Sequence, residues 1–123
     1  MGIGLPGAIA AKLVHPDRRV VAVCGDGGFL MTAHELETAV RLGVGVTVVV
    51  FHDNAYGSIK RKQLARFGRA SGVDFGNPDF VQLAHSFNAQ GYRPSRASEL
   101  ASILDNALDS RKPSVIDVPV DYS

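Results

Sequence analysis

The sequence contains one cysteine, Cys24, and its charges almost cancel, with 13 Lys and Arg against 12 Asp and Glu. One cysteine excludes both an intramolecular disulfide framework and a zinc site built from cysteines. The charge balance gives no reason to expect a nucleic-acid partner. Long apolar runs are missing too: the stretch at 46–51 is far too short to cross a bilayer, and no secretory leader opens the chain. We therefore expect a cytoplasmic protein without membrane segments.

The composition that remains is typical of a folded domain. Hydrophobic residues make up 46% of the chain and charged residues 20%, which argues against disorder. A chain of 123 residues suffices for one domain and one hydrophobic core, but not for two ordinary domains.

Apolar runs alternate with helical patterns along the chain. We expect strands at 20–24, 46–51, 89–92 and 114–118, and helices at 8–14, 36–43, 77–87 and 98–110. Thr32 and Glu35 have the spacing of a capping box at the start of the second helix. Because the strands are apolar throughout, the pattern predicts an α/β fold with three layers, α/β/α, around a mainly parallel sheet.

Two polar turns follow predicted strands, at 25–28 and at 52–57. Ligands of such sheets bind outside the carboxyl ends of the strands. In the first turn, glycine amides suit a phosphate group, and Asp26 beside a phosphate requires a divalent cation between them. Asn54 supplies a neutral oxygen of the kind that Mg²⁺ accepts. The alternative is that the first turn is only a tight turn and that Asn54 only caps the next segment.

The spacing of these turns resembles the thiamin diphosphate signature, a Gly-Asp-Gly followed some two dozen or more residues later by Asn. Here Gly25-Asp26-Gly27 is followed by 26 residues and then Asn54. The segments 1–12, 35–39, 53–57 and 115–119 also resemble acetolactate synthase-like enzymes. The chain is thus similar, over essentially its whole length, to the C-terminal, diphosphate-binding domain of these enzymes. The resemblance implies the thiamin diphosphate-binding fold, without the first elements that this fold has in the related enzymes. The implied cofactors are thiamin diphosphate and Mg²⁺.

The resemblance implies a role for particular residues. Asp26 and Asn54 would bind Mg²⁺ through side-chain oxygens, and Tyr56 through its backbone carbonyl. Met1 lies where the family places a large apolar residue under the bent cofactor; the alternative is an initiator methionine without a role. The full set implied to bind the cofactor is Met1, Gly25, Asp26, Gly27, Gly28, Phe29, Asn54, Tyr56, Gly57 and Ser58.

The sequence also departs from the family. Related enzymes combine a pyrimidine-binding, a central and a diphosphate-binding domain, and a glutamate of the first protonates the cofactor. Neither that domain nor that glutamate is found here, so residues 1–123 are interpreted as one partial domain: a fragment, a truncated gene product or a small part of a split enzyme. We expect no catalytic residue in this chain and no activity from it alone.

The function implied is part of a 2-oxo acid decarboxylase or carboligase. The alternative is a non-catalytic assembly subunit of a split thiamin diphosphate enzyme. An unrelated nucleotide-binding domain is a third reading, but its Gly-x-Gly-x-x-Gly or Walker pattern is absent. We expect a dimer or tetramer, or a pyrimidine-binding partner, because apolar surface at 2–11 and 32–39 would lie uncovered.

A basic segment at 60–69 carries five of the thirteen positive charges. A solvated helix face is the commoner explanation, and attraction of the diphosphate or of an acidic substrate is the functional one. His52 is interpreted as a residue with a local structural role, because a diphosphate site favours hard oxygen ligands over imidazole. Cys24, inside an apolar strand, is interpreted as a small buried hydrophobic residue.

Overall fold

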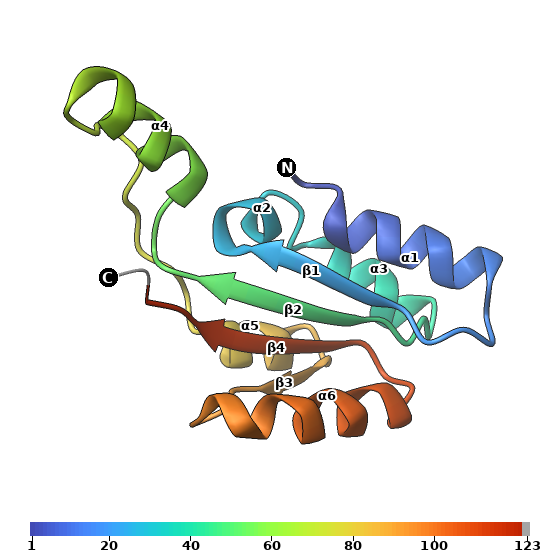
Figure 1. Ribbon diagram of the computed structural model, residues 1–123. Helices are drawn as coiled ribbons and strands as arrows, with labels where there is room; N and C mark the ends of the chain where they lie inside the picture. The colour runs from blue at the N-terminus through green and yellow to red at the C-terminus, as the bar shows by residue number, and fades with distance from the viewer. Residues whose placement is uncertain (122–123) are drawn as a thin grey trace.

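The structure, a computed structural model, describes residues 1–121. Within these residues the chain forms a four-stranded sheet in the order β1-β2-β4-β3, and every pairing is parallel (Figure 1). The strands are β1 Val21–Gly25, β2 Thr47–His52, β3 Gln90–Tyr92 and β4 Ser114–Pro119. The predicted parallel α/β fold is therefore confirmed.

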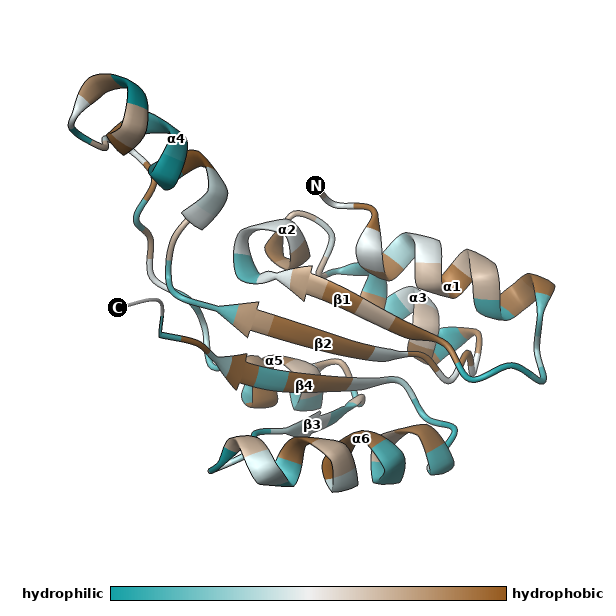
Figure 2. Cartoon of the chain, in the orientation of Figure 1, coloured by the Kyte–Doolittle hydropathy of each residue, from teal (hydrophilic) through white to brown (hydrophobic). Residues whose placement is uncertain are grey.

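One face of the sheet carries most of the helices. These are α1 Gly4–Val14, α2 Asp26–Leu30, α3 Glu35–Arg41 and α5 Phe80–Ser86. Leu5, Phe29, Leu36 and Phe80, one from each helix, are almost fully buried in the same cluster as Val48 of β2. The strands are hydrophobic along most of their length (Figure 2), and this layer of helices buries apolar side chains of one face of the sheet.

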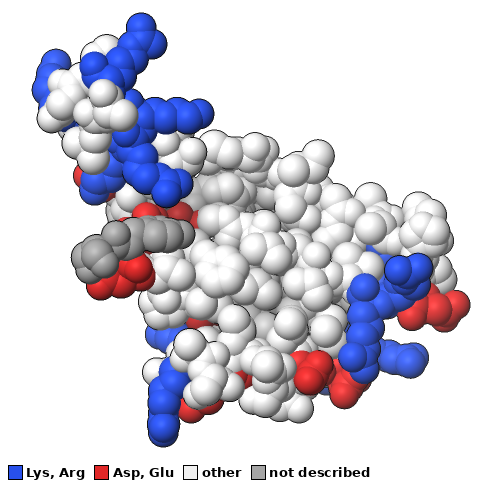
Figure 3. All heavy atoms as spheres, in the orientation of Figure 1, with Lys and Arg blue, Asp and Glu red and all other residues white. Residues whose placement is uncertain are grey.

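The opposite face is covered over only part of its width. Helix α6 Leu100–Asp109, preceded by the 3₁₀ turn η1 Ala97–Glu99, packs Ala107 against Val49 and Ile116. On β1 the same face is open, because Val21 is 39% exposed and Val23 66% exposed. Figure 3 shows a broad surface without charged side chains here. The predicted three layers are therefore present. Among the described residues, however, the second helix layer covers only part of the sheet and leaves β1 open.

Helix α4 Gly57–Phe67 stands away from the body of the molecule (Figure 1). None of its described residues is buried, although Ile59, Leu64 and Phe67 are apolar. It contains most of the basic segment, whose side chains form the blue group over α4 in Figure 3. The solvated-helix explanation of that segment is thus consistent with the structure.

Two details of the sequence prediction are wrong. The capping box does not form: the N-cap of α3 is His34 without a side-chain cap, and the Thr32 hydroxyl donates instead to the Gly2 carbonyl at 3.1 Å. Helix α1 begins at Gly4 rather than at residue 8, because its Pro6 falls in the first turn, where proline needs no hydrogen-bond partner for its nitrogen.

The expected apolar surface also differs from the one observed. In α1 and α3 the large apolar side chains of Leu5, Ile9 and Leu36 point into the core and are buried. The exposed large apolar side chains in and next to these segments are Met1, Ile3, Leu13, Val14 and Met31, and of these only Ile3 lies within the predicted 2–11 and 32–39. Among the described helices, none combines the length and the apolar character needed to span a membrane.

Candidate cofactor and metal site

The two polar turns meet at the carboxyl edge of the sheet. Strands β1 and β2 are neighbours, with Gly25 paired to Phe51, so the segments that follow them begin side by side. Asp26 starts α2 directly after β1, and Asp53 and Asn54 follow β2. Figure 1 shows the strand ends, α2 and the start of α4 at this one edge.

Asp26 is the buried anionic group of this edge. The residue is only 3% exposed, and its two carboxylate oxygens accept three hydrogen bonds. Oδ1 accepts from the Gly27 amide at 2.8 Å, while Oδ2 accepts from the Asn54 amide at 3.0 Å and from Asn77 Nδ2 at 2.8 Å. A buried carboxylate needs such donors to offset the loss of water. Asp26 thereby fixes the second turn against the first.

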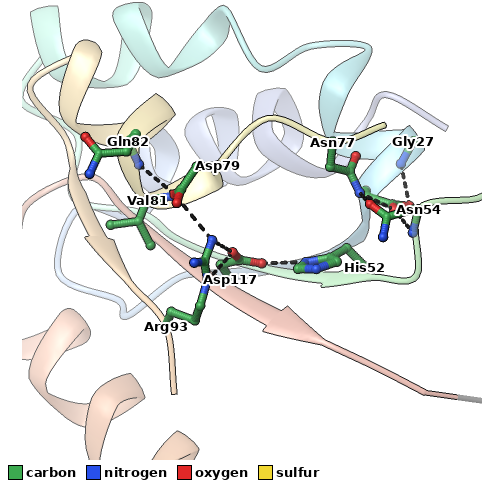
Figure 4. Close-up of polar contacts among 10 residues, drawn as sticks. Gly27, His52, Asn54, Asn77, Asp79, Val81, Gln82, Arg93 and Asp117 are labelled. Atoms are coloured by element: carbon green, nitrogen blue, oxygen red, sulfur yellow. Dashed lines mark hydrogen bonds and ion pairs between the residues drawn. The ribbon is translucent and has the colours of Figure 1, made fainter. Parts of the chain in front are cut away.

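Asn54 is held in an unusual backbone conformation beside this carboxylate. Its φ is +59°, in the left-handed region that asparagine tolerates better than most residues. Its side-chain Oδ1 accepts from Asn77 Nδ2 at 2.9 Å. Asp26 and Asn54 thus direct one oxygen each toward the same nitrogen atom (Figure 4). The resemblance implies that both residues bind one Mg²⁺, which requires these two oxygens to lie close together, and this geometry is compatible with that prediction.

A cavity of about 330 Å³ opens next to these groups. Its wall contains eight of the ten residues implied to bind the cofactor: Met1, Gly25, Asp26, Gly27, Gly28, Tyr56, Gly57 and Ser58. The other two are Asn54, at the neighbouring turn, and Phe29, whose ring is buried and packs edge-on against Phe80 at 5.6 Å. Phe29 can therefore contribute only its backbone to a ligand. Roles in cofactor binding stay predictions for all ten.

Tyr56 has two distinct contacts at the site. Its carbonyl accepts from the amides of Ile59 and Lys60, at 2.8 and 2.9 Å, in the first turn of α4. A metal bound to the Tyr56 carbonyl would share this oxygen with the two amides of α4. The predicted metal-ligand role of Tyr56 therefore competes with the hydrogen bonds that begin this helix. The Tyr56 ring packs against Phe75, 4.8 Å between centroids, and lies directly over Gly27.

Cys24 also lines the cavity. Its thiol is partly buried, and burial raises its pKa because the thiolate would lose water. The expectation of an inert, small hydrophobic residue is consistent with this environment.

A second polar cluster lies beside the first (Figure 4). Asp117 of β4 is fully buried, and its Oδ2 accepts from Arg93 Nε at 2.7 Å, with Arg93 Nη2 at 2.5 Å. Its Oδ1 lies 2.5 Å from His52 Nδ1 at the end of β2. Hydrogen bonding to Asp117 raises the pKa of Arg93, and Arg93 reaches on to Asp79 at 3.3 Å. The predicted local structural role of His52 agrees with this contact.

The donor set at the edge fits a hard divalent cation. Asp26 and Asn54 offer one carboxylate and one amide oxygen, the ligands that Mg²⁺ prefers. Among the described residues, no group of three or more His, Cys, Asp or Glu is placed to hold a metal ion. Water and phosphate oxygens would complete the coordination shell, as in sites that bind the metal together with a phosphorylated ligand.

Comparison with known proteins decides the family. The profile described as "Thiamine pyrophosphate enzyme, C-terminal TPP binding domain" matches residues 1–118. The chain belongs to this family. Thiamine pyrophosphate is thiamin diphosphate, so the family's cofactor is the one implied by the sequence.

Individual relatives agree with this assignment. The chain is 48% identical to the acetolactate synthase of Bacillus subtilis over its full length, which is 22% of that protein. It is 37% identical to the pyruvate oxidase of Lactiplantibacillus plantarum over 98% of the chain and 20% of the relative. A thiamin diphosphate-dependent 4-hydroxybenzoylformate decarboxylase of Rhodococcus jostii matches all of the chain, 24% of the solved structure, with a TM-score of 0.92 and 27% identity.

These comparisons place the chain as a thiamin diphosphate-binding domain of acetolactate synthase-like enzymes. It spans only about a fifth of the length of these relatives, because the matched share of each is between 20% and 24%. Their complete activities therefore do not transfer directly to this domain.

The sequence reasoning missed one residue of the site, Asn77. It treated Asn77-Pro78-Asp79 as the start of a helix, and Asp79 does cap α5 by accepting from the amides of Val81 and Gln82. Asn77 itself crosses to Asp26, 51 positions earlier in the chain. A signal was present in Pro78, which favours an extended residue before it and so keeps Asn77 out of the helix.

Proposed function

We propose that this domain binds the diphosphate of thiamin diphosphate through Mg²⁺ within an enzyme that decarboxylates 2-oxo acids or joins them to a second carbonyl compound. The observation that supports this most is the convergence of Asp26 Oδ2 and Asn54 Oδ1 on one point at the carboxyl edge, beside a cavity lined by glycines. When bound, the cofactor supplies the carbon nucleophile and the electron sink of such reactions.

The chain's own residues would bind and orient the cofactor. Asp26 and Asn54 hold the metal, with the Tyr56 carbonyl as a further ligand if α4 shares it. The Gly28 amide and the Ser58 hydroxyl would bind the diphosphate, and the Gly27 amide would share it with Asp26 Oδ1, to which it already donates at 2.8 Å. Met1, on the cavity wall, supports the cofactor's bend.

Binding of the cofactor tests this proposal directly. We would titrate thiamin diphosphate into the 123-residue chain by calorimetry, with Mg²⁺ and with EDTA. Asn54→Gly removes the side-chain oxygen but keeps the left-handed backbone, since glycine adopts positive φ without strain. We expect Mg²⁺-dependent binding that is lost in Asn54→Gly and Asp26→Ala and kept in Asp105→Ala, an exposed control on α6. Thiamin diphosphate binding that does not depend on Mg²⁺, or that persists unchanged in both site variants, would refute the proposal.

We further propose that the domain acts as part of a larger assembly, in a cytoplasmic dimer or tetramer or with a pyrimidine-binding partner. The open face of β1, with Val21 and Val23 exposed, and the isolated helix α4 support this. Sedimentation of the chain as a monomer at high concentration would contradict self-association. The competing function, a non-catalytic assembly subunit, predicts a partner complex without cofactor binding.

We expect no turnover by the chain alone, because the resemblance assigns the cofactor's proton relay to a glutamate of another domain. Carbon dioxide release from pyruvate, with thiamin diphosphate and Mg²⁺, measures this. Turnover that disappears in Asp26→Ala would refute the expectation, whereas activity restored by a pyrimidine-binding partner would support it.

A further inference from the structure

One buried carboxylate connects the end of β2 to the start of α5 (Figure 4). Asp117 lies on β4, the strand between β2 and β3, and is completely buried. Its Oδ1 lies 2.5 Å from Nδ1 of His52, the last residue of β2. Its Oδ2 accepts from Arg93 at 2.7 Å, and Arg93 reaches on to Asp79, the N-cap of α5. Asp117 therefore contacts both neighbours of the candidate site from below the cavity.

Each arm of this cluster ends two positions from a residue of the site. His52 precedes Asn54 by two residues, and Asp79 follows Asn77 by two. Pro78 restricts the backbone between Asn77 and Asp79, because its ring fixes φ. Asn77 Nδ2 donates to Asn54 Oδ1 at 2.9 Å, so the contacts form a closed ring that contains both segments.

The contact between His52 and Asp117 has no substitute. His52 Nδ1 and Asp117 Oδ1 are both buried, and neither has a hydrogen-bond partner elsewhere within residues 1–121. The imidazole also packs against Phe80 of α5, with 5.8 Å between ring centroids. Buried polar clusters of this kind often add little stability over apolar residues of the same volume. What this cluster supplies is a defined distance between β2, β4 and α5.

We propose that Asp117 is a positioning residue for the candidate cofactor site. Through His52 it fixes the turn that follows β2, and through Arg93 it fixes the segment that precedes α5. The turn then places the side-chain oxygen of Asn54. Asp117 is not part of the cavity wall, so it acts only through these neighbours. The inference rests on the proposed function for what the turn binds.

Two substitutions of His52 test the first arm. Asparagine carries its amide nitrogen on Cγ, as the imidazole carries Nδ1, so His52→Asn keeps a donor for Asp117 but loses most of the ring. His52→Leu keeps apolar bulk against Phe80 but has no donor. We would titrate thiamin diphosphate with Mg²⁺ by calorimetry, at a temperature where urea denaturation shows each variant to be folded. We expect His52→Asn to bind like the parent chain and His52→Leu about tenfold more weakly, a usual loss when support of metal ligands is removed.

A second pair of variants separates positioning from stability. Asp117→Asn removes the charge shared by both arms and should also weaken binding about tenfold. Ser114→Ala is the matched control: Ser114 is equally buried in β4, donates to Thr47 Oγ1 at 3.0 Å, and lies at the opposite, amino end of the strand. It should lower the urea midpoint and leave cofactor binding unchanged.

Two results would overturn the inference. If His52 acts only by packing, His52→Leu would bind the cofactor at least as tightly as His52→Asn. If Asp117 acts only through global stability, Ser114→Ala would weaken binding in proportion to its loss of stability.

Amide hydrogen exchange, measured without metal or cofactor, keeps the two proposals apart. The Asn54 amide donates to Asp26 Oδ2 at 3.0 Å, whereas the Thr47 amide is bonded at the opposite end of β2. Relative to Thr47, we expect the Asn54 amide to exchange faster in His52→Leu than in His52→Asn. This result in a chain that fails to bind thiamin diphosphate would remove the proposed function and keep the positioning role. Mg²⁺-dependent binding with equal affinity and equal exchange in the two variants would keep the function and remove the role of Asp117.

Discussion

Adding one methyl group at Gly27 should disturb the candidate site, whereas the same change at Gly28 should not. A Cβ on Gly27 would lie 2.3 Å from Tyr56 Cε1 and 2.6 Å from Cδ1. At Gly28, one position further along α2, no described atom would lie within 4 Å of the added carbon. The pair Gly27→Ala and Gly28→Ala therefore compares a crowded and an open position in the same helix.

The crowding at Gly27 can be relieved only by moving the tyrosine ring. Carbon atoms in contact are normally 3.5–4.0 Å apart, so the ring must shift by more than about 1 Å. The backbone of Tyr56 is held by its amide, which donates to the Val73 carbonyl at 2.8 Å, and by the turn that starts α4. The ring must then leave its contact with Phe75, at 4.8 Å.

The two variants should differ clearly in stability. Overpacking of this kind costs about 1–3 kcal/mol. Alanine is favoured over glycine in helices by up to about 1 kcal/mol. Gly28→Ala should gain this stabilisation in full, whereas in Gly27→Ala the clash with Tyr56 outweighs it. We therefore expect Gly28→Ala to be as stable as the parent or slightly more stable, and Gly27→Ala to be less stable by about 1–2 kcal/mol.

Urea denaturation measures this difference, and tyrosine fluorescence can follow it because the sequence contains no tryptophan. The native spectrum of Gly27→Ala should itself change, since Tyr56 loses its aromatic neighbour. Equal denaturation midpoints for the two variants would refute the argument, because they would show that the ring is not fixed over Gly27.

Three further outcomes follow from single contacts. Arg93→Met should destabilise the fold by about 2–3 kcal/mol, measured by urea denaturation, because it leaves the buried carboxylate of Asp117 without its main partner. Arg96→Met, at an exposed position, should change stability by less than about 0.5 kcal/mol, and equal losses would contradict this. Alkylation of Cys24 followed by mass spectrometry should need a higher pH than that of a free thiol, since burial raises its pKa; a reaction as fast as that of a free thiol would be inconsistent with burial. The hydrogen bond that the Gln82 amide donates lowers the pKa of Asp79 below its usual 3.8. The stabilisation of α5 by Asp79 should therefore be complete above pH 3.8 and lost as the pH falls through the lower, folded pKa; acid titration of Asp79→Ala against the parent checks this.

Local chemistry along the chain was sufficient to predict the strands and the two polar turns. Short apolar runs rich in β-branched residues, such as 46–51, favour buried strands, and glycine around Asp26 predicts a turn that approaches a ligand closely. The order of motifs was enough for the resemblance to thiamin diphosphate enzymes. The neighbouring turns after β1 and β2 followed from parallel strands, whose carboxyl ends share one edge.

Which distant residues meet at this edge depends on the folded chain as a whole. Thr32 donates to Gly2 rather than capping α3, because the N-terminal segment lies within its reach. Asn77 contacts Asp26 across 51 positions of sequence, and Asp117 contacts Arg93 across 24. No local propensity encodes such pairs. Their positions depend on how α5 and β4 pack against the sheet, so the contact of Asn77 with Asp26 could be found only once the chain was folded.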